Sequence, residues 1–219
     1  VFIITTTSDK YISSCVTNEI ERKCKWSRHL SDKTKLILVN HEFGMIYNKM
    51  DDLKMLGLPI IEDMAMSMFS TDISHKTGKY GDFTIFSLPK FFPVQFGGVL
   101  RINNQNALSF AFEEDKIIAK DLQKLASFYL NNVESIKAGR RQNYYKFEKE
   151  LSKLGIRPKF QLQELEIPSV FMFATPPNAD KDKLKVFLQD NGVESSVFYG
   201  ENAFFIPVHQ NLEDADIKF

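Results

Sequence analysis

Short apolar runs alternate with helical stretches in the first hundred residues, and this alternation limits the fold more than any other feature. The runs cover residues 36–41, 59–63, 83–87 and 97–102. A continuous apolar run of this length is typical of a strand that is buried on both faces of a parallel sheet. Between the first two runs, residues 51–56 predict a short helix that ends at Gly57. The pattern predicts an α/β fold, a mostly parallel sheet with flanking helices.

The second half of the chain has a different pattern, in which helices are longer and strands fewer. Apolar residues at helical spacing predict one long helix over residues 118–136, an interruption at Gly139 and a second helix over 141–154. A strand at 169–174, a helix capped by Asp180 and a last strand at 193–198 follow. We therefore predict two domains: residues 1–135 in the α/β layer, and residues 136–219 as a long helix with a small α+β C-terminal domain.

Charge and composition exclude several classes of protein. The 219 residues carry 28 Lys plus Arg against 28 Asp plus Glu, so the chain lacks the basic surplus of a protein that coats nucleic acid or an anionic membrane. No apolar run approaches the roughly 18 residues of a membrane-spanning helix. The two cysteines have no neighbours at zinc-ligand spacing. We predict a cytoplasmic protein with no metal, nucleic-acid or membrane partner.

The chain opens at Val1 within an apolar, β-branched run. We expect it to be a piece of a longer protein.

Polar residues stand at the ends of the predicted strands. Asn40 and His41 end the first, Glu62 and Asp63 the second, and Ser87 the third, with Lys90 three residues later. Ligands of open α/β sheets gather at the carboxyl ends of the strands. A lysine can form a Schiff base with an aldehyde cofactor, an acid can pair with a protonated pyridine nitrogen, and a hydroxyl can hold a phosphate. This set is compatible with a pyridoxal phosphate (PLP) site, although the spacing alone leaves other readings open.

An ordered series of motifs is more specific than these residue types. The run from Leu36 to Gly98 resembles the DegT/DnrJ-type family of PLP-dependent nucleotide-sugar aminotransferases, of the fold-type I class. The matching pieces are residues 39–44, 58–65, 78–83, 86–90 and 96–98, followed in the C-terminal part by 192–193, 198–200 and 207–209. The resemblance implies an incomplete fold-type I large domain that lacks the family's N-terminal segment.

The resemblance also implies a role for individual residues. Lys90, seven residues before the Gly97-Gly98 pair, would be the Schiff-base lysine. Asp63 would pair with the pyridinium nitrogen, Ser87 would bind the phosphate of pyridoxal 5'-phosphate, and Tyr11 would stack on the ring.

The activity that the resemblance implies is transfer of an amino group to a keto sugar carried on a nucleotide, in surface polysaccharide or related glycan biosynthesis. The amino donor would be glutamate, the working form a homodimer, and His41 and His209 would contact substrate. Dehydratases of the family carry histidine in place of the lysine, and Lys90 argues against that branch.

Two alternatives stay open. Met66 stands where the family has Gln or His, and the spacing from Ser87 to Lys90 is two residues shorter than in the family. Both departures are compatible with a non-catalytic relative that keeps the fold for binding or regulation. A Rossmann-type nucleotide-binding domain would need a Gly-x-Gly-x-x-Gly turn after its first strand, and the sequence has none.

Overall fold

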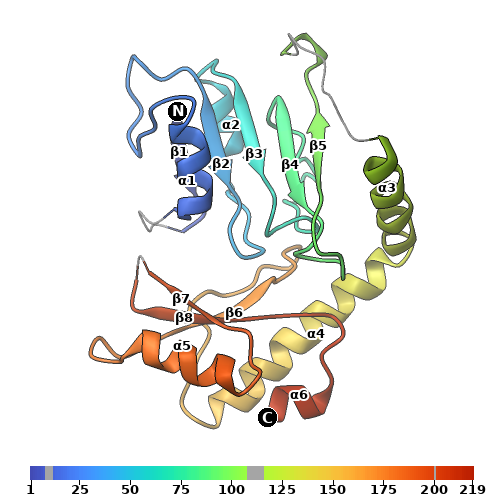
Figure 1. Cartoon of the computed structure of the whole chain (residues 1–219). Coiled ribbons are helices and arrows are strands. Elements are labelled where there is room, and N and C mark those ends of the chain that lie inside the picture. Colours follow the sequence, from blue (N-terminus) through green and yellow to red (C-terminus); the bar gives the residue numbers. More distant parts are fainter. Residues whose placement is uncertain (8–11, 108–115, 200) are drawn as a thin grey trace.

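The computed structural model contains two β-sheets connected by long helices (Figure 1). It describes residues 1–7, 12–107, 116–199 and 201–219. The first sheet has the order β1-β2-β3-β4-β5; its first four strands run parallel, and β5 is antiparallel to β4. Its strands are β1 (Phe2–Thr5), β2 (Ile37–Asn40), β3 (Ile60–Asp63), β4 (Phe83–Ser87) and β5 (Gly98–Ile102).

Helices pack on both faces of this sheet at strands β1 and β2, which explains why these strands carry apolar side chains on both faces, whereas β5 is largely exposed. Helix α1 (Ser14–Glu21) packs on the face that carries Ile3 and Leu38. The short helix α2 (Met50–Lys54) packs on the opposite face, against Ile37 and Val39 (Figure 1). The predicted α/β architecture with a mostly parallel sheet is confirmed.

Two helices follow the first sheet after the 3-10 turn η1 (Gln105–Ala107): α3 (Lys116–Leu130) and α4 (Val133–Ser152). The predicted interruption at Gly139 is wrong, because the break lies at residues 131–132 and Gly139 sits inside α4. The predicted domain boundary after residue 135 falls in the first turn of α4 and stays a prediction. No helix in the described part of the chain combines the length and apolar character needed to cross a membrane.

The second sheet forms the small α+β part of the fold. Its strands β6 (Val170–Ala174), β8 (Ala203–Pro207) and β7 (Ser196–Phe198) pair antiparallel in that order. Helix α5 (Lys181–Asp190) begins as predicted at Asp180, whose carboxylate accepts a hydrogen bond of 2.9 Å from the Lys183 amide. Helix α6 (Asp214–Lys218) packs beside α4. The core of this part is rich in aromatic rings, with Phe171 and Phe204 fully buried.

Gly44 and Ser70 connect the two sheets, since both contact the segment that leads into β6. The Ser70 hydroxyl donates to the Gly44 carbonyl at 2.6 Å and accepts from the Ile167 amide at 2.8 Å. The Ser169 amide donates to the Phe43 carbonyl at 3.2 Å. The loop after β2 is therefore held against the start of β6 by the Ser70 hydroxyl and by a direct backbone hydrogen bond, so little space remains for larger residues between them.

Candidate functional site

The carboxyl edge of the parallel strands brings two of the predicted site residues, Asp63 and Ser87, together. In register, Thr5 lies opposite Asn40, Asn40 opposite Asp63, and Asp63 opposite Ile85. Ser87 follows Ile85 by two positions on β4. Because side chains alternate along a strand, Asp63 and Ser87 point to the same face of the sheet, which is the face covered by α1 at its other end.

Asp63 presents a partly open carboxylate at this edge. Its Oδ1 accepts a hydrogen bond of 2.9 Å from the Ala65 amide. Within the described residues, no hydrogen bond is made to its Oδ2. Burial raises the pKa of Asp63, while the hydrogen bond from the Ala65 amide acts in the opposite direction. The side chain can therefore accept a hydrogen bond from a ligand that reaches this edge of the sheet.

Lys90 follows in a turn whose neighbours are buried. Leu88, Phe91 and Phe92 belong to one apolar cluster with Ile136, whereas the Lys90 side chain is exposed. The amides of Phe91 and Phe92 both donate to the Leu88 carbonyl, at 3.1 and 2.9 Å. The amine of Lys90 is thus accessible, although the backbone that carries it is firmly packed.

His41 occupies a different kind of position from the one that the sequence led us to expect. Its side chain is fully buried. The Tyr47 amide donates to its Nδ1 at 3.1 Å, so that nitrogen carries no proton, and the Nε2–H donates to Glu62 at 3.3 Å. Both ring nitrogens are used inside the protein, and this placement is that of a structural histidine rather than of one that contacts a substrate.

Glu62 is the centre of that buried network, although the sequence pointed to it only as one of the polar residues at the strand ends. It is fully buried, and its carboxylate accepts hydrogen bonds from the amides of Gly78 at 2.9 Å and Gly81 at 2.8 Å, besides His41. Because Glu62 precedes Asp63 on the strand, it points to the opposite face, the one on which α2 packs. An acid at such a position must be paired.

We expect the Glu62→Ala substitution to lower the free energy of unfolding by about 3 kcal/mol, because two backbone amides and the buried His41 lose their acceptor together. Urea denaturation would measure the loss. The Glu19→Ala substitution, which removes an exposed partner of Arg22, is the control and should leave the stability nearly unchanged. Equal effects of the two substitutions would contradict the assignment of Glu62.

Of the two remaining predicted residues, His209 belongs to the C-terminal part of the chain, and Tyr11 is not among the described residues. His209 is half-buried in the loop after β8, where its carbonyl accepts from Asn143 at 2.8 Å and its Nδ1 accepts from the Asn211 amide at 3.2 Å. Burial, reinforced by Arg140, lowers the pKa of His209. Tyr11, the predicted stacking residue, lies outside the described residues. The structure thus groups Asp63 and Ser87 on one face and leaves the roles of the other residues as predictions.

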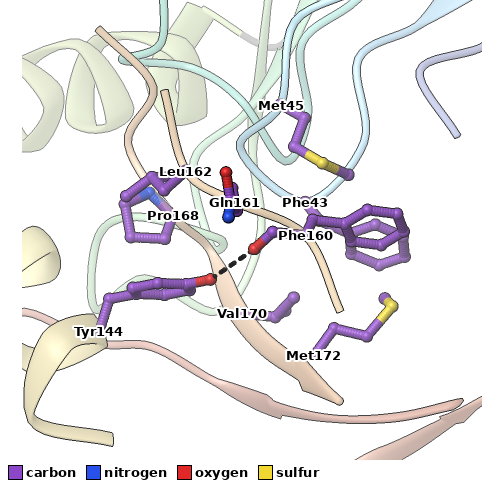
Figure 2. A pocket seen from close by; sticks show the side chains of 9 residues that line it. All are labelled: Phe43, Met45, Tyr144, Phe160, Gln161, Leu162, Pro168, Val170 and Met172. Atoms are coloured by element: carbon purple, nitrogen blue, oxygen red, sulfur yellow. Dashed lines mark hydrogen bonds between the residues drawn. The ribbon is translucent and has the colours of Figure 1, made fainter. Parts of the chain in front are cut away.

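A small hollow lies between the loop after β2 and the start of β6 (Figure 2). Its volume is about 20 Å³, and most of its lining is apolar. Figure 2 shows the Tyr144 hydroxyl pointing at the Phe160 carbonyl, to which it donates at 3.0 Å. The hollow can hold no more than a water molecule, so we regard it as a packing feature of the connection between the sheets.

A larger hollow, of about 900 Å³, lies among α4, α5, α6 and β8. Apolar side chains such as Leu151, Phe187 and Phe219 form much of its wall, and His209 is the only predicted site residue there. Neither hollow is lined by Asp63, Ser87 or Lys90. The candidate site is therefore the polar strand edge rather than either of these hollows.

Comparison with known proteins connects this edge with one family. Residues 23–106 match the model of the DegT/DnrJ/EryC1/StrS aminotransferase family. The matched segment contains Asp63, Ser87 and Lys90, and the resemblance drawn from the sequence is confirmed there. No curated protein sequence matches the chain at a significant level.

Solved structures share the fold over almost the whole chain. The aminotransferase TlmJ from Streptoalloteichus hindustanus superposes with a TM-score of 0.70 at 19% identity, over 87% of this chain and 65% of its own. A DegT DnrJ EryC1 StrS aminotransferase from Brucella abortus gives 0.63 at 17% identity, over 92% of this chain and 64% of its own. The PLP form of Spr1654, a putative sugar aminotransferase from Streptococcus pneumoniae, gives 0.72 at 15% identity, over 99% and 77%.

These likenesses establish the fold. The chain covers slightly less than two thirds of the length of the first two proteins.

Proposed function

From the family match of residues 23–106, we propose that this chain belongs to a PLP-dependent aminotransferase that acts on a keto sugar linked to a nucleotide. Glutamate is the amino donor in this proposal, and the product enters surface polysaccharide or related glycan biosynthesis. The observation that carries the proposal is the position of Asp63 and Ser87 on one face of the sheet, at the carboxyl edge, inside the segment that matches the family.

The donor set at this edge fits pyridoxal 5'-phosphate. Asp63 offers a carboxylate oxygen with no hydrogen-bond partner among the described residues, which suits a pyridinium N–H. Ser87, half-buried at the end of β4, offers a hydroxyl for the phosphate, and Lys90 offers an accessible amine. When bound, the cofactor supplies an electron sink for the carbanion that forms on deprotonation of the amino donor.

Each residue has a separate role in this proposal. Lys90 would hold the cofactor through its Nζ and would move the proton at the α-carbon of the amino donor. Asp63 holds the proton on the ring nitrogen through its carboxylate. Ser87 orients the ring through the phosphate. Tyr11 remains proposed as the stacking residue, and His209 as a contact of the sugar substrate.

The proposal extends to assembly and location. A homodimer would cover some of the large apolar side chains that stand exposed on β5 and α3, among them Val99, Leu100, Ile118 and Phe128. We propose a cytoplasmic location, in keeping with the free thiols of Cys15 and Cys24.

We expect the Asp63→Asn substitution to weaken retention of PLP by about tenfold to a hundredfold, because a charge-assisted hydrogen bond to the pyridinium is lost. Equilibrium dialysis, with absorbance of the bound cofactor as the readout, would measure it. The Asp51→Asn substitution in the first turn of α2 is the matched control and should bind PLP as the wild type does.

The pKa of Asp63 adds a pH dependence to this test. Only the carboxylate pairs with the pyridinium, so wild-type retention should fall as pH drops through the raised pKa. In the absence of PLP, the contribution of Asp63 to the stability of the folded chain depends on pH in the opposite direction. The folded-state pKa lies above the unfolded value, so the stability contributed by the protonated acid is complete below the unfolded pKa and is lost as pH rises through the folded pKa. At neutral pH the Asp63→Asn chain should therefore be no less stable than the wild type, and equal PLP retention by the two would refute the role of Asp63.

A further inference from the structure

The turn that carries Lys90 is held from outside its own sheet. The Lys90 carbonyl accepts a hydrogen bond of 2.8 Å from Nη2 of Arg140, on helix α4. The next carbonyl, that of Phe91, accepts one of 3.1 Å from the side-chain amide of Gln210, in the loop after β8. Two consecutive carbonyls are therefore bound by side chains that are distant in sequence.

Arg140 is unusually buried for an arginine, with 1% of its surface exposed. Its guanidinium lies over the Phe91 ring at 4.3 Å and donates to the Gln210 side-chain oxygen at 3.0 Å and to the Pro168 carbonyl at 3.4 Å. Within the described residues, its hydrogen-bond acceptors are all uncharged oxygens. A buried charge without a carboxylate partner is costly. The planar, multiply donating guanidinium compensates by joining three separate chain segments.

Gln210 reaches this position because α4 lets its backbone approach closely. A Cβ on Gly139 would lie 3.2 Å from the Gln210 carbonyl oxygen, so a larger residue would displace the loop. Asn143, one turn further along α4, is buried and donates to the carbonyls of His209 at 2.8 Å and Leu212 at 3.1 Å. The loop at residues 209–212 is thus seated on α4 independently of the Lys90 turn.

We infer that Arg140 and Gln210 are positioning residues that set the location of the Lys90 amine, so that the C-terminal part of the chain controls how Lys90 meets the cofactor. The inference rests on the proposed function, since it assumes that Lys90 reacts with PLP. The inference also requires that the two side chains immobilise the backbone of the turn. This requirement can be tested without any cofactor.

The Gln210→Glu substitution is the sharpest test. It keeps an oxygen for Arg140 but cannot donate to the Phe91 carbonyl. We expect hydrogen exchange of the amides of Phe91 and Phe92 to become about tenfold faster, with little change in the melting temperature. Borohydride trapping of PLP, followed by peptide mapping, should show several-fold less label on Lys90 relative to surface lysines. The Arg140→Lys substitution should change both readouts in the same direction, because lysine cannot bridge three segments.

The Gln189→Glu substitution is the matched control. Gln189 also donates to a carbonyl, that of Ser195, at 3.3 Å, but at the end of α5. It should leave exchange in the turn and trapping at Lys90 unchanged.

The outcomes separate the inference from the proposed function. Unchanged exchange at Phe91 and Phe92 in the Gln210→Glu chain would overturn the inference. Faster exchange with undiminished trapping at Lys90 would also overturn it, since the amine would then not depend on the turn. If PLP is not trapped selectively at Lys90 in the wild type, the proposed function fails, and the role of the two residues in placing the amine fails with it. The exchange data would still show whether they hold the turn.

Discussion

Replacement of Lys90 by alanine should abolish covalent capture of pyridoxal 5'-phosphate by this chain. In the wild type, borohydride reduction after addition of PLP should leave the label on Lys90, because its amine is accessible while the turn beneath it is packed and hydrogen-bonded. In the Lys90→Ala chain, only the weak and scattered labelling of surface lysines should remain. Peptide mapping by mass spectrometry would locate the label, and the visible absorbance of the Schiff base would be lost in parallel.

The Lys79→Ala substitution is the matched control for this experiment. Lys79 is exposed, lies in the segment that matches the family, and belongs to the loop between β3 and β4. Its replacement should leave capture intact. Persistence of the Schiff-base absorbance in the Lys90→Ala chain would refute the assignment of Lys90. If capture occurs at Lys90 but L-glutamate does not convert the bound cofactor, the alternative of a non-catalytic relative, which Met66 favours, would replace the aminotransferase.

The Gly44→Ala substitution should lower the free energy of unfolding by about 3 to 5 kcal/mol. A Cβ on Gly44 would lie 2.3 Å from the Ile167 carbonyl oxygen and 2.9 Å from the Pro168 Cα, and both are backbone atoms that cannot rotate away. The backbone of Gly44 also has a φ of +99°, which alanine adopts only under strain. The added methyl group would push the loop after β2 away from the start of β6. Urea denaturation at neutral pH would measure the loss.

The Gly57→Ala substitution separates the two causes. Gly57 has a φ of +64°, but nothing lies within 4 Å of an added Cβ. Its replacement should cost only about 1 kcal/mol, from backbone strain alone. If Gly44→Ala is no more destabilising than Gly57→Ala, the close approach of the loop to Ile167 is not a constraint on stability.

The sequence predicted the strands of the first sheet better than any other feature. In β2 the apolar run is continuous because helices pack on both of its faces, whereas β5 carries a similar run but is largely exposed. Helix ends were harder to predict. Gly139 was interpreted as a break since glycine is a poor helix former. Inside α4, the small size of Gly139 lets Gln210 approach the helix closely. Helix propensity depends on the residue type alone and does not predict that contact.

The residues of the candidate site also differ in how far the sequence could predict their positions. Asp63 and Ser87 could be placed at one edge from their position in the chain, because parallel strands end together. His41 and Glu62 could not be distinguished from ligand-binding residues, since burial and pairing with the amides of Gly78 and Gly81 become visible only in three dimensions. Arg140 had no sequence signal at all.

The sequence by itself determined the α/β layer, the parallel pairing and the set of polar residues at the strand ends, because these follow from side-chain periodicity along a local segment. Only the tertiary structure decided which polar residues are buried and which remain accessible. It also brought Arg140 and Gln210 to the turn of Lys90. Such contacts join residues that are 50 or 119 positions apart, and they depend on how helix α4 packs against β6 and against the turn after β4 rather than on any local pattern.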